Sequence, residues 1–141
     1  MPPSQDPFLL DLFQDFLAFE RGLLPRSVAA YRSDVERLSR WLGDQGLQDP
    51  SQADLELLRR WVYHLKDQGL APASIRRSLS SVRAYFAFLQ GEGAVREDPT
   101  ELLESPRSWR TLPEVLSRDE VERLLEAPDP DAPSYWRDRA I

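Results

Sequence analysis

The chain has 141 residues, of which 41% are hydrophobic and 30% are charged, a composition typical of a globular protein. It holds no cysteine and one histidine, which excludes disulfides, thiolate zinc sites and histidine metal clusters. No stretch approaches about 18 consecutive apolar residues and no secretory signal is recognisable, so we predict a soluble, cytoplasmic protein. We expect no cofactor, no membrane contact and no small-molecule substrate.

The net charge of −6 would repel a polyanion at long range if the charge were spread evenly. Residues 72–90 instead contain three arginines and no acidic residue, whereas residues 91–141 carry a net charge of −6. Arginine accounts for 17 of the 18 basic residues, and its guanidinium group suits bidentate contacts with phosphate and guanine. The acidic total is therefore compatible with a local basic site.

The first two predicted helices lie before residue 46. The first begins with Asp6 as N-cap and Pro7 at the first helical position, and it ends near Gly22. Its apolar residues recur at helical spacing: Phe8, Leu9, Leu12, Phe13, Phe16 and Leu17. The second follows Pro25, with Ser27 as its candidate cap. Its apolar seam is Val28, Tyr31, Val35, Leu38 and Leu42.

Two more helices complete the predicted bundle. The third begins at Ser51, with Asp54 in a capping-box-like position, and it ends at Gly69. The fourth begins at Pro72 and closes near Gly91. It carries the most regular apolar seam of the chain: Ile75, Leu79, Val82, Phe86 and Leu89. Four helices with short connections and no alternating strand pattern predict an all-α, antiparallel bundle.

The remaining residues predict a linker and the start of a further domain. Residues 105–116 lack periodicity and contain two prolines, which is typical of an interdomain linker. Beyond them, Ser117 and Glu120 have capping-box spacing ahead of a short helix. We therefore expect a first domain at residues 1–104, a linker at 105–116 and, at 117–141, the truncated start of a second domain that breaks off at Ile141.

Basic residues on the predicted fourth helix are the main candidates for ligand contacts. Arg76, Ser80 and Arg83 step along a stripe beside the apolar seam, while Arg77 is expected on the far side. The stripe contains no carboxylate, and short side chains such as Ser74 would let a phosphate approach the backbone. A solvated helix face explains the same residues, and by itself the pattern favours that interpretation.

The second predicted helix gives a weaker signal. Its basic and acidic residues alternate, so intrahelical ion pairs explain much of the pattern: Arg26, Arg32, Asp34, Glu36, Arg37, Arg40 and Asp44. We interpret Tyr31 as a core tyrosine and His64 as a partly buried structural residue. No phosphate loop, metal-ligand spacing or nucleophile–base pair is recognisable.

Three stretches in this order resemble the N-terminal core-binding domain of the Xer-type tyrosine recombinases, the phage-integrase family. They are residues 24–35, 74–86 and 112–125, with Asp98 and Pro99 before the third. The first two look like the family patterns T-x-x-x-Y-x-x-D-L and R-x-L-S-A-x-R-x-x-F-x-x-L, with Ser27 and Val35 as departures from threonine and leucine. The resemblance covers nearly the whole chain.

The resemblance implies a four-helix, SAM-like bundle that closes over one side of a DNA duplex, followed by the beginning of a catalytic domain. It implies a double-stranded recombination site and a second recombinase protomer as partners, as in chromosome-dimer resolution. In this family the nucleophilic tyrosine and its helpers belong to the catalytic domain, so we expect this chain by itself not to be an enzyme. The candidate DNA-binding residues are Arg26, Ser27, Arg32, Ser74, Arg76, Arg77, Ser80 and Arg83.

Two alternatives stay open. The chain could belong to a phage or transposon integrase instead of a Xer protein, and only the target DNA sequence would separate the two. It could also be a helical protein-interaction module that does not bind DNA, with its arginines serving as solvated surface.

Overall fold

The fold is given by a computed structural model that describes residues 6–105 and 115–140. The chain forms two compact units, Met1–Ser108 and Trp109–Ile141, and each is considered by itself. Within the described ranges every regular element is helical and no strand occurs. The prediction of an all-α protein is therefore confirmed.

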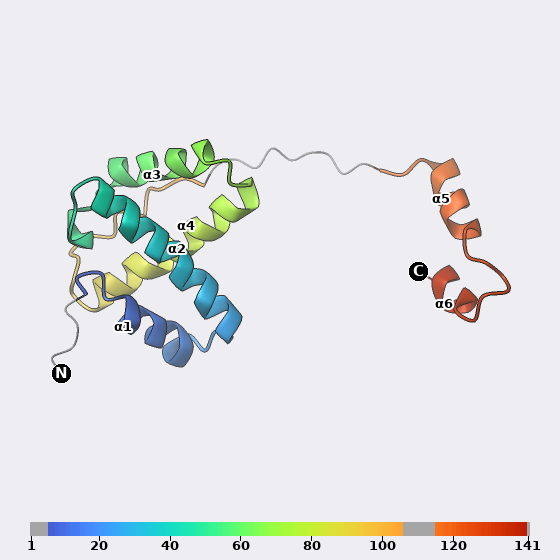
Figure 1. Ribbon diagram of the computed structural model, residues 1–141, viewed down its shortest axis with the longest axis horizontal. Helices are drawn as coiled ribbons and strands as arrows, with labels where there is room; N and C mark the ends of the chain where they lie inside the picture. The colour runs from blue at the N-terminus through green and yellow to red at the C-terminus, as the bar shows by residue number, and fades with distance from the viewer. Residues whose placement is uncertain (1–5, 106–114, 141) are drawn as a thin grey trace. The chain divides into compact units, whose positions relative to one another are not determined.

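The first unit is built around two long helices (Figure 1). Its elements are α1 (Leu10–Asp15), a π-helical turn (Phe16–Glu20), α2 (Pro25–Asp44), a 3-10 turn (Pro50–Gln52), α3 (Leu55–Asp67) and α4 (Pro72–Gly91). Helix α2 packs chiefly against α4, α1 packs against α2, and α3 packs against α4. The pair α2 and α4 therefore supports the other elements of the bundle.

The core forms where the predicted seams meet. All five seam residues of α4 are buried, as the sequence predicts: Ile75, Leu79, Val82, Phe86 and Leu89. Helix α1 contributes Phe13, whose ring centroid lies 5.2 Å from that of Tyr85 and 5.6 Å from that of Phe88. Burying an aromatic side chain of this size contributes about 1.5–3 kcal/mol, so these contacts hold the short α1 on the bundle.

The first helix begins later than predicted. The Asp6 carboxylate accepts hydrogen bonds from the backbone N–H groups of Phe8 and Leu10, both at 3.0 Å. Leu9 has φ 51°, a left-handed backbone that interrupts any helix at this point. Asp6 therefore closes a turn around Pro7 and is not the helix cap that was expected.

The starts of α2 and α3 also differ from the prediction. Helix α2 begins at Pro25 with Leu24 in the cap position, so Ser27 lies inside the first turn and caps nothing. Helix α3 is capped by Asp54, whose carboxylate accepts from the Leu57 N–H at 2.7 Å. Ser51, the expected start, lies in the preceding 3-10 turn because Pro50 favours a turn there. Gly69, with φ 79°, follows α3 as predicted.

The second unit contains α5 (Arg118–Glu126) and α6 (Tyr135–Arg139). The predicted capping box is present: Ser117 Oγ accepts from the Glu120 N–H at 3.3 Å, and the Glu120 carboxylate accepts from the Ser117 N–H at 2.7 Å. Most of the predicted linker lies outside the described residues. The boundaries at 104 and 117 therefore remain predictions.

None of the helices in the described ranges combines the length and the apolar character that crossing a membrane requires.

Candidate nucleic-acid interface

The outer face of α4 is basic and otherwise made of small residues. Because Ile75, Leu79 and Val82 face the core, the opposite side of the helix is left to solvent. Arg76, Arg77 and Ser80 are exposed there. The same side of the helix also carries the exposed Ala73 and Ala87 and the half-buried Arg83 and Ala84. Since no residue of α4 is acidic, this face carries positive charge with little side-chain bulk.

Arg77 lies at the edge of this face, next to α2, and not on the far side as predicted. Its Nη2 and Nε atoms donate to the two carboxylate oxygens of Asp34 at 3.0 and 3.2 Å. These hydrogen bonds, together with the negative charge of Asp34, raise the pKa of Arg77 above its ordinary value. Asp34 therefore pairs with another helix, and the expectation of ion pairs within α2 is wrong for this residue.

One flank of α2 continues the basic surface of α4. Residues at spacings of three, four and seven or eight share a helix face, so Arg26, Ser27 and Arg37 lie on the same flank of α2 as Asp34. Arg26 is exposed, and Ser27 and Arg37 are half-buried. Among residues 6–105 and 115–140, no carboxylate lies within ion-pair distance of Arg26 or Arg37.

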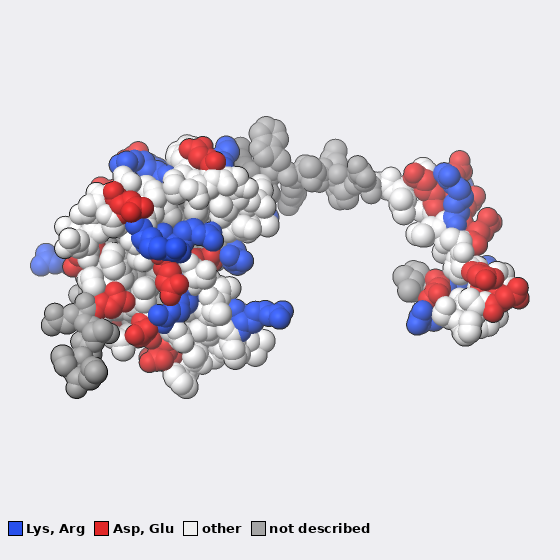
Figure 2. All heavy atoms as spheres, in the orientation of Figure 1, with Lys and Arg blue, Asp and Glu red and all other residues white. Residues whose placement is uncertain are grey.

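We call this surface the arginine face. It consists of Arg26 and Arg37 on α2 and Arg76, Arg77 and Arg83 on α4. Acidic side chains lie beside basic ones on the face of the molecule turned toward the viewer in Figure 2. The positive potential of the first unit is therefore local, and it acts over a distance of about one Debye length, roughly 8–10 Å.

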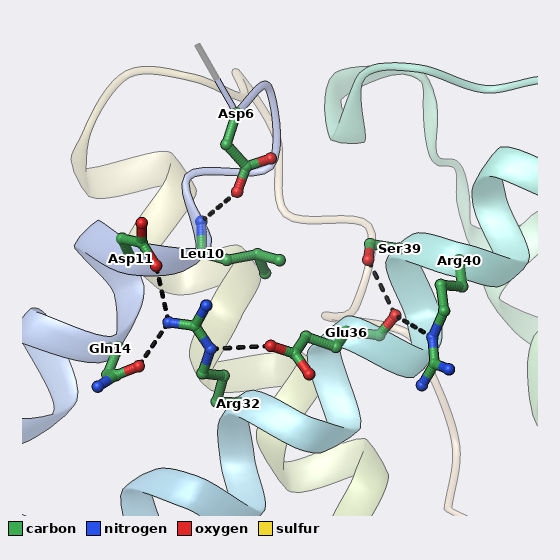
Figure 3. Close-up of polar contacts among 8 residues, drawn as sticks. All are labelled: Asp6, Leu10, Asp11, Gln14, Arg32, Glu36, Ser39 and Arg40. Atoms are coloured by element: carbon green, nitrogen blue, oxygen red, sulfur yellow. Dashed lines mark hydrogen bonds and ion pairs between the residues drawn. The ribbon is translucent and has the colours of Figure 1, made fainter. Parts of the chain in front are cut away.

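The structure separates Arg32 from the arginine face. Its guanidinium donates to Asp11 and Glu36, both at 2.8 Å, and also to Gln14, so it joins α2 to α1 (Figure 3). Hydrogen bonds to Glu36 and Asp11 raise the pKa of Arg32. The side chain is 29% exposed. Because the Nε and Nη1 donors are occupied within the protein, we leave Arg32 out of the arginine face, and its contact with DNA stays a prediction.

The first turns of α2 and α4 share one property that suits an anion. Both begin with proline and have no side-chain cap, so the N–H groups of Arg26, Ser27, Ala73 and Ser74 donate to no capping side chain. Both helices begin on the right-hand side of the bundle in Figure 1. Free N–H groups at a helix N-terminus favour phosphate oxygens. Ser74, a predicted site residue, is half-buried in the first turn of α4.

Two residues of the site were not recognised as such in the sequence. Arg37 was assigned to intrahelical ion pairs, although it forms none with the residues that the structure describes. Asp34 was treated as surface charge, yet its side chain is fully buried. The sequence did mark Asp34, since it stands three residues after Tyr31 and four before Leu38, at a buried position where an acidic residue requires a partner.

Tyr85 is structural. Its side chain is fully buried, and its hydroxyl donates to the backbone carbonyl of Phe8 at 2.7 Å. Burial raises the pKa of this hydroxyl, and the charges of Asp6 and Asp49 raise it further. Within the described residues no group of three or more metal-ligating side chains is found.

The chain matches one known protein family over more than half of its length. A family model described as phage integrase, N-terminal SAM-like domain, matches residues 10–93, from the start of α1 to just beyond α4. The chain belongs to this family. In this SAM-like domain, the arginine face is formed by α2 and α4, both of which lie within the matched residues.

Curated relatives of this SAM-like domain include tyrosine recombinases. Tyrosine recombinase XerD of Vibrio cholerae is 39% identical over 140 residues, which are 98% of this chain and 45% of that protein. Tyrosine recombinase XerC of Xanthomonas campestris is 39% identical over 141 residues, 99% of this chain and 44% of that protein. Tyrosine recombinase XerD of Staphylococcus aureus is 33% identical over 133 residues, 94% of this chain and 45% of that protein.

The resemblance to Xer-type recombinases is therefore confirmed. The chain spans less than half the length of the curated relatives it matches. Identity to the XerD of Vibrio cholerae and to the XerC of Xanthomonas campestris is the same, so these two comparisons do not separate the two types.

Proposed function

We propose that this chain is the N-terminal DNA-binding part of a Xer-type site-specific tyrosine recombinase. The observation that carries the proposal is the outer face of α4, where Arg76, Arg77 and Arg83 are accompanied by alanine and serine and by no acidic residue of the same helix. Small residues between arginines let a helix approach a duplex closely, and an α-helix fits the major groove of B-DNA.

In this proposal α4 lies in or along the major groove, and the first turns of α2 and α4 meet phosphates. Arg26 and Ser74 lie in those turns, where uncapped N–H groups add to the side-chain contacts. Contacts of this kind fix the orientation of the protein on the duplex and carry little sequence information. Base-edge contacts from Arg76 would supply the discrimination.

The activity of the whole protein belongs to the same proposal. The partners would be a recombination half-site in double-stranded DNA and a second recombinase protomer, in a reaction such as chromosome-dimer resolution in the cytoplasm. The chain itself would position the DNA for a catalytic domain. We expect it to form no covalent adduct with DNA by itself, and denaturing electrophoresis after incubation with duplex substrates measures this.

A salt titration tests the proposal. The 141-residue chain is titrated into a fluorescein-labelled duplex, and the dissociation constant is measured by anisotropy at several salt concentrations. About four or five neutralised phosphates would give a slope of log K against log salt near −4. No binding at about 50 mM salt, or an affinity that does not change with salt, would contradict the proposal.

A second candidate function is supported by an apolar hollow of about 220 Å³. Phe19 is 83% exposed and Leu12 is 52% exposed beside Phe16 and Phe88, with Asp15, Glu20 and Glu92 around them. Exposed aromatic residues of this kind mark protein-interaction surfaces. NMR titration separates the two functions, because duplex DNA should shift resonances of α4 and a protein partner should shift those around Phe19.

A further inference from the structure

Asp34 is the single acidic or basic side chain that is fully buried in the part of the chain that the structure describes. Burying a carboxylate is costly unless hydrogen bonds replace its water. Both of its oxygens are used: Oδ1 accepts from Arg77 Nη2 and from Ser78 Oγ at 3.2 Å, and Oδ2 accepts from Arg77 Nε and from Ser81 Oγ at 2.7 Å. An ionised carboxylate has about four lone-pair positions, so Asp34 is saturated.

The same contacts fix the guanidinium of Arg77. Two of its five N–H groups point at Asp34 in a side-on fork, and the planar group therefore directs the other three N–H groups away from the carboxylate. The side chain of Arg77 is 51% exposed, whereas that of Asp34 is not exposed at all. The outward N–H groups are thus held at the edge of the arginine face.

We propose that Asp34 is a positioning residue for DNA binding. It holds Arg77 so that the outward N–H groups of the guanidinium donate to two oxygens of one phosphate. This proposal rests on the proposed DNA binding and names the contact geometry within it. An arginine that is already held in place loses less freedom when it binds than a mobile one. The cost is electrostatic, because the negative charge of Asp34 opposes the phosphate.

The charge of Asp34 and its positioning of Arg77 have opposite effects on DNA affinity, so one substitution separates them. Asp34→Asn removes one negative charge next to the arginine face, so a role limited to charge predicts tighter binding to duplex DNA. Positioning predicts the reverse. We expect Asp34→Asn to bind a labelled duplex about 2- to 10-fold more weakly at low salt, the factor expected when one side chain must be immobilised on binding. In an Arg77→Ala background only the charge effect remains, so the same substitution should no longer weaken binding.

Ser81→Ala serves as the matched control. It removes one hydrogen bond from the same carboxylate and leaves the Arg77 fork in place. It should lower the melting temperature while the folded protein keeps the affinity of the unaltered chain. If Asp34→Asn does not fold, Arg77→Lys replaces it: the charge is retained, but the fork is lost, and the affinity should still fall by a similar factor.

The outcomes separate the two proposals. If the unaltered chain does not bind duplex DNA, the proposed function and the positioning role both fail. If the unaltered chain binds but Asp34→Asn or Arg77→Lys binds as tightly or more tightly, only the positioning role is overturned. If Asp34→Asn weakens binding equally with and without Arg77, Asp34 does not act through Arg77 and the proposal is overturned as well.

Discussion

Arg83 on α4 donates a hydrogen bond from Nη2 to the backbone carbonyl of Leu103, twenty residues further along the chain. Leu103 is 3% exposed, so the bond ties the segment that follows α4 back onto the helix. No carboxylate of the described residues lies within ion-pair distance of Arg83, and its charge is not neutralised. Arg83 therefore combines a structural contact with a place on the arginine face.

Substitution of Arg83 should consequently change both stability and DNA binding. Arg83→Ala leaves the Leu103 carbonyl without its partner, and we expect the free energy of unfolding to fall by about 1 kcal/mol in urea titrations. The slope of log K against log salt should shrink by about one. Arg83→Lys keeps the charge, so it should retain most of the slope. An unchanged slope for Arg83→Ala would remove this residue from the interface.

Arg76 should affect DNA binding alone. It is exposed, and no ion pair of the described residues includes it. We expect Arg76→Ala to change the free energy of unfolding by less than about 0.5 kcal/mol and to reduce the salt slope by about one. Arg59→Ala on α3 is the matched control, since Arg59 is exposed and its nearest carboxylate, Glu56, is 3.7 Å away. Equal losses in the two variants would show that net charge decides, and the arginine face would lose its role.

Arg32 should show the opposite behaviour. Its removal leaves Asp11, Gln14 and Glu36 without their shared donor and removes this polar link between α2 and α1. We expect Arg32→Ala to lower the free energy of unfolding by about 1–2 kcal/mol, measured by urea denaturation. The salt slope of DNA binding should match that of the unaltered chain. A slope reduced as much as in Arg76→Ala would restore Arg32 as a DNA contact.

Tyr85→Phe isolates one buried hydrogen bond. The hydroxyl of Tyr85 donates to the Phe8 carbonyl at 2.7 Å, and without it this carbonyl loses its only side-chain donor among the described residues. We expect the free energy of unfolding to fall by about 1 kcal/mol in urea titrations. Tyr63→Phe is the control, because Tyr63 is 66% exposed and should change stability by less than about 0.5 kcal/mol. Equal stabilities of the two variants would contradict the structural role of Tyr85.

The capping box of α5 should respond to acid. Hydrogen bonds from the backbone and side chain of Ser117 lower the pKa of Glu120 below its ordinary value of 4.5. A carboxylate with a lowered pKa stabilises its helix fully above the ordinary value, and it loses that contribution as the pH falls through the lowered pKa. NMR of the Ser117 amide should therefore report an intact box near neutral pH and its loss in acid. In Glu120→Gln, the amide shift should lose this pH dependence; an unchanged titration would assign it to another group.

The sequence by itself determined the helical class and the burial pattern. The spacing of Ile75, Leu79 and Val82 was enough to identify the buried side of α4, because a helix has a fixed period and only one of its sides can face a core. The capping box at Ser117 and Glu120 was equally predictable, since all of its atoms lie within four residues. The family resemblance also came from local patterns and was confirmed by the match at residues 10–93.

The tertiary structure decided which charges are free. Asp34 pairs with Arg77, forty-three positions away, and Arg32 pairs with Asp11, twenty-one positions away. Sequence periodicity shows which side of a helix is polar, but it does not show which side of another helix lies opposite. Coulomb interactions and hydrogen bonds depend on distances of a few ångströms in space, and those distances are set only when the helices pack against each other.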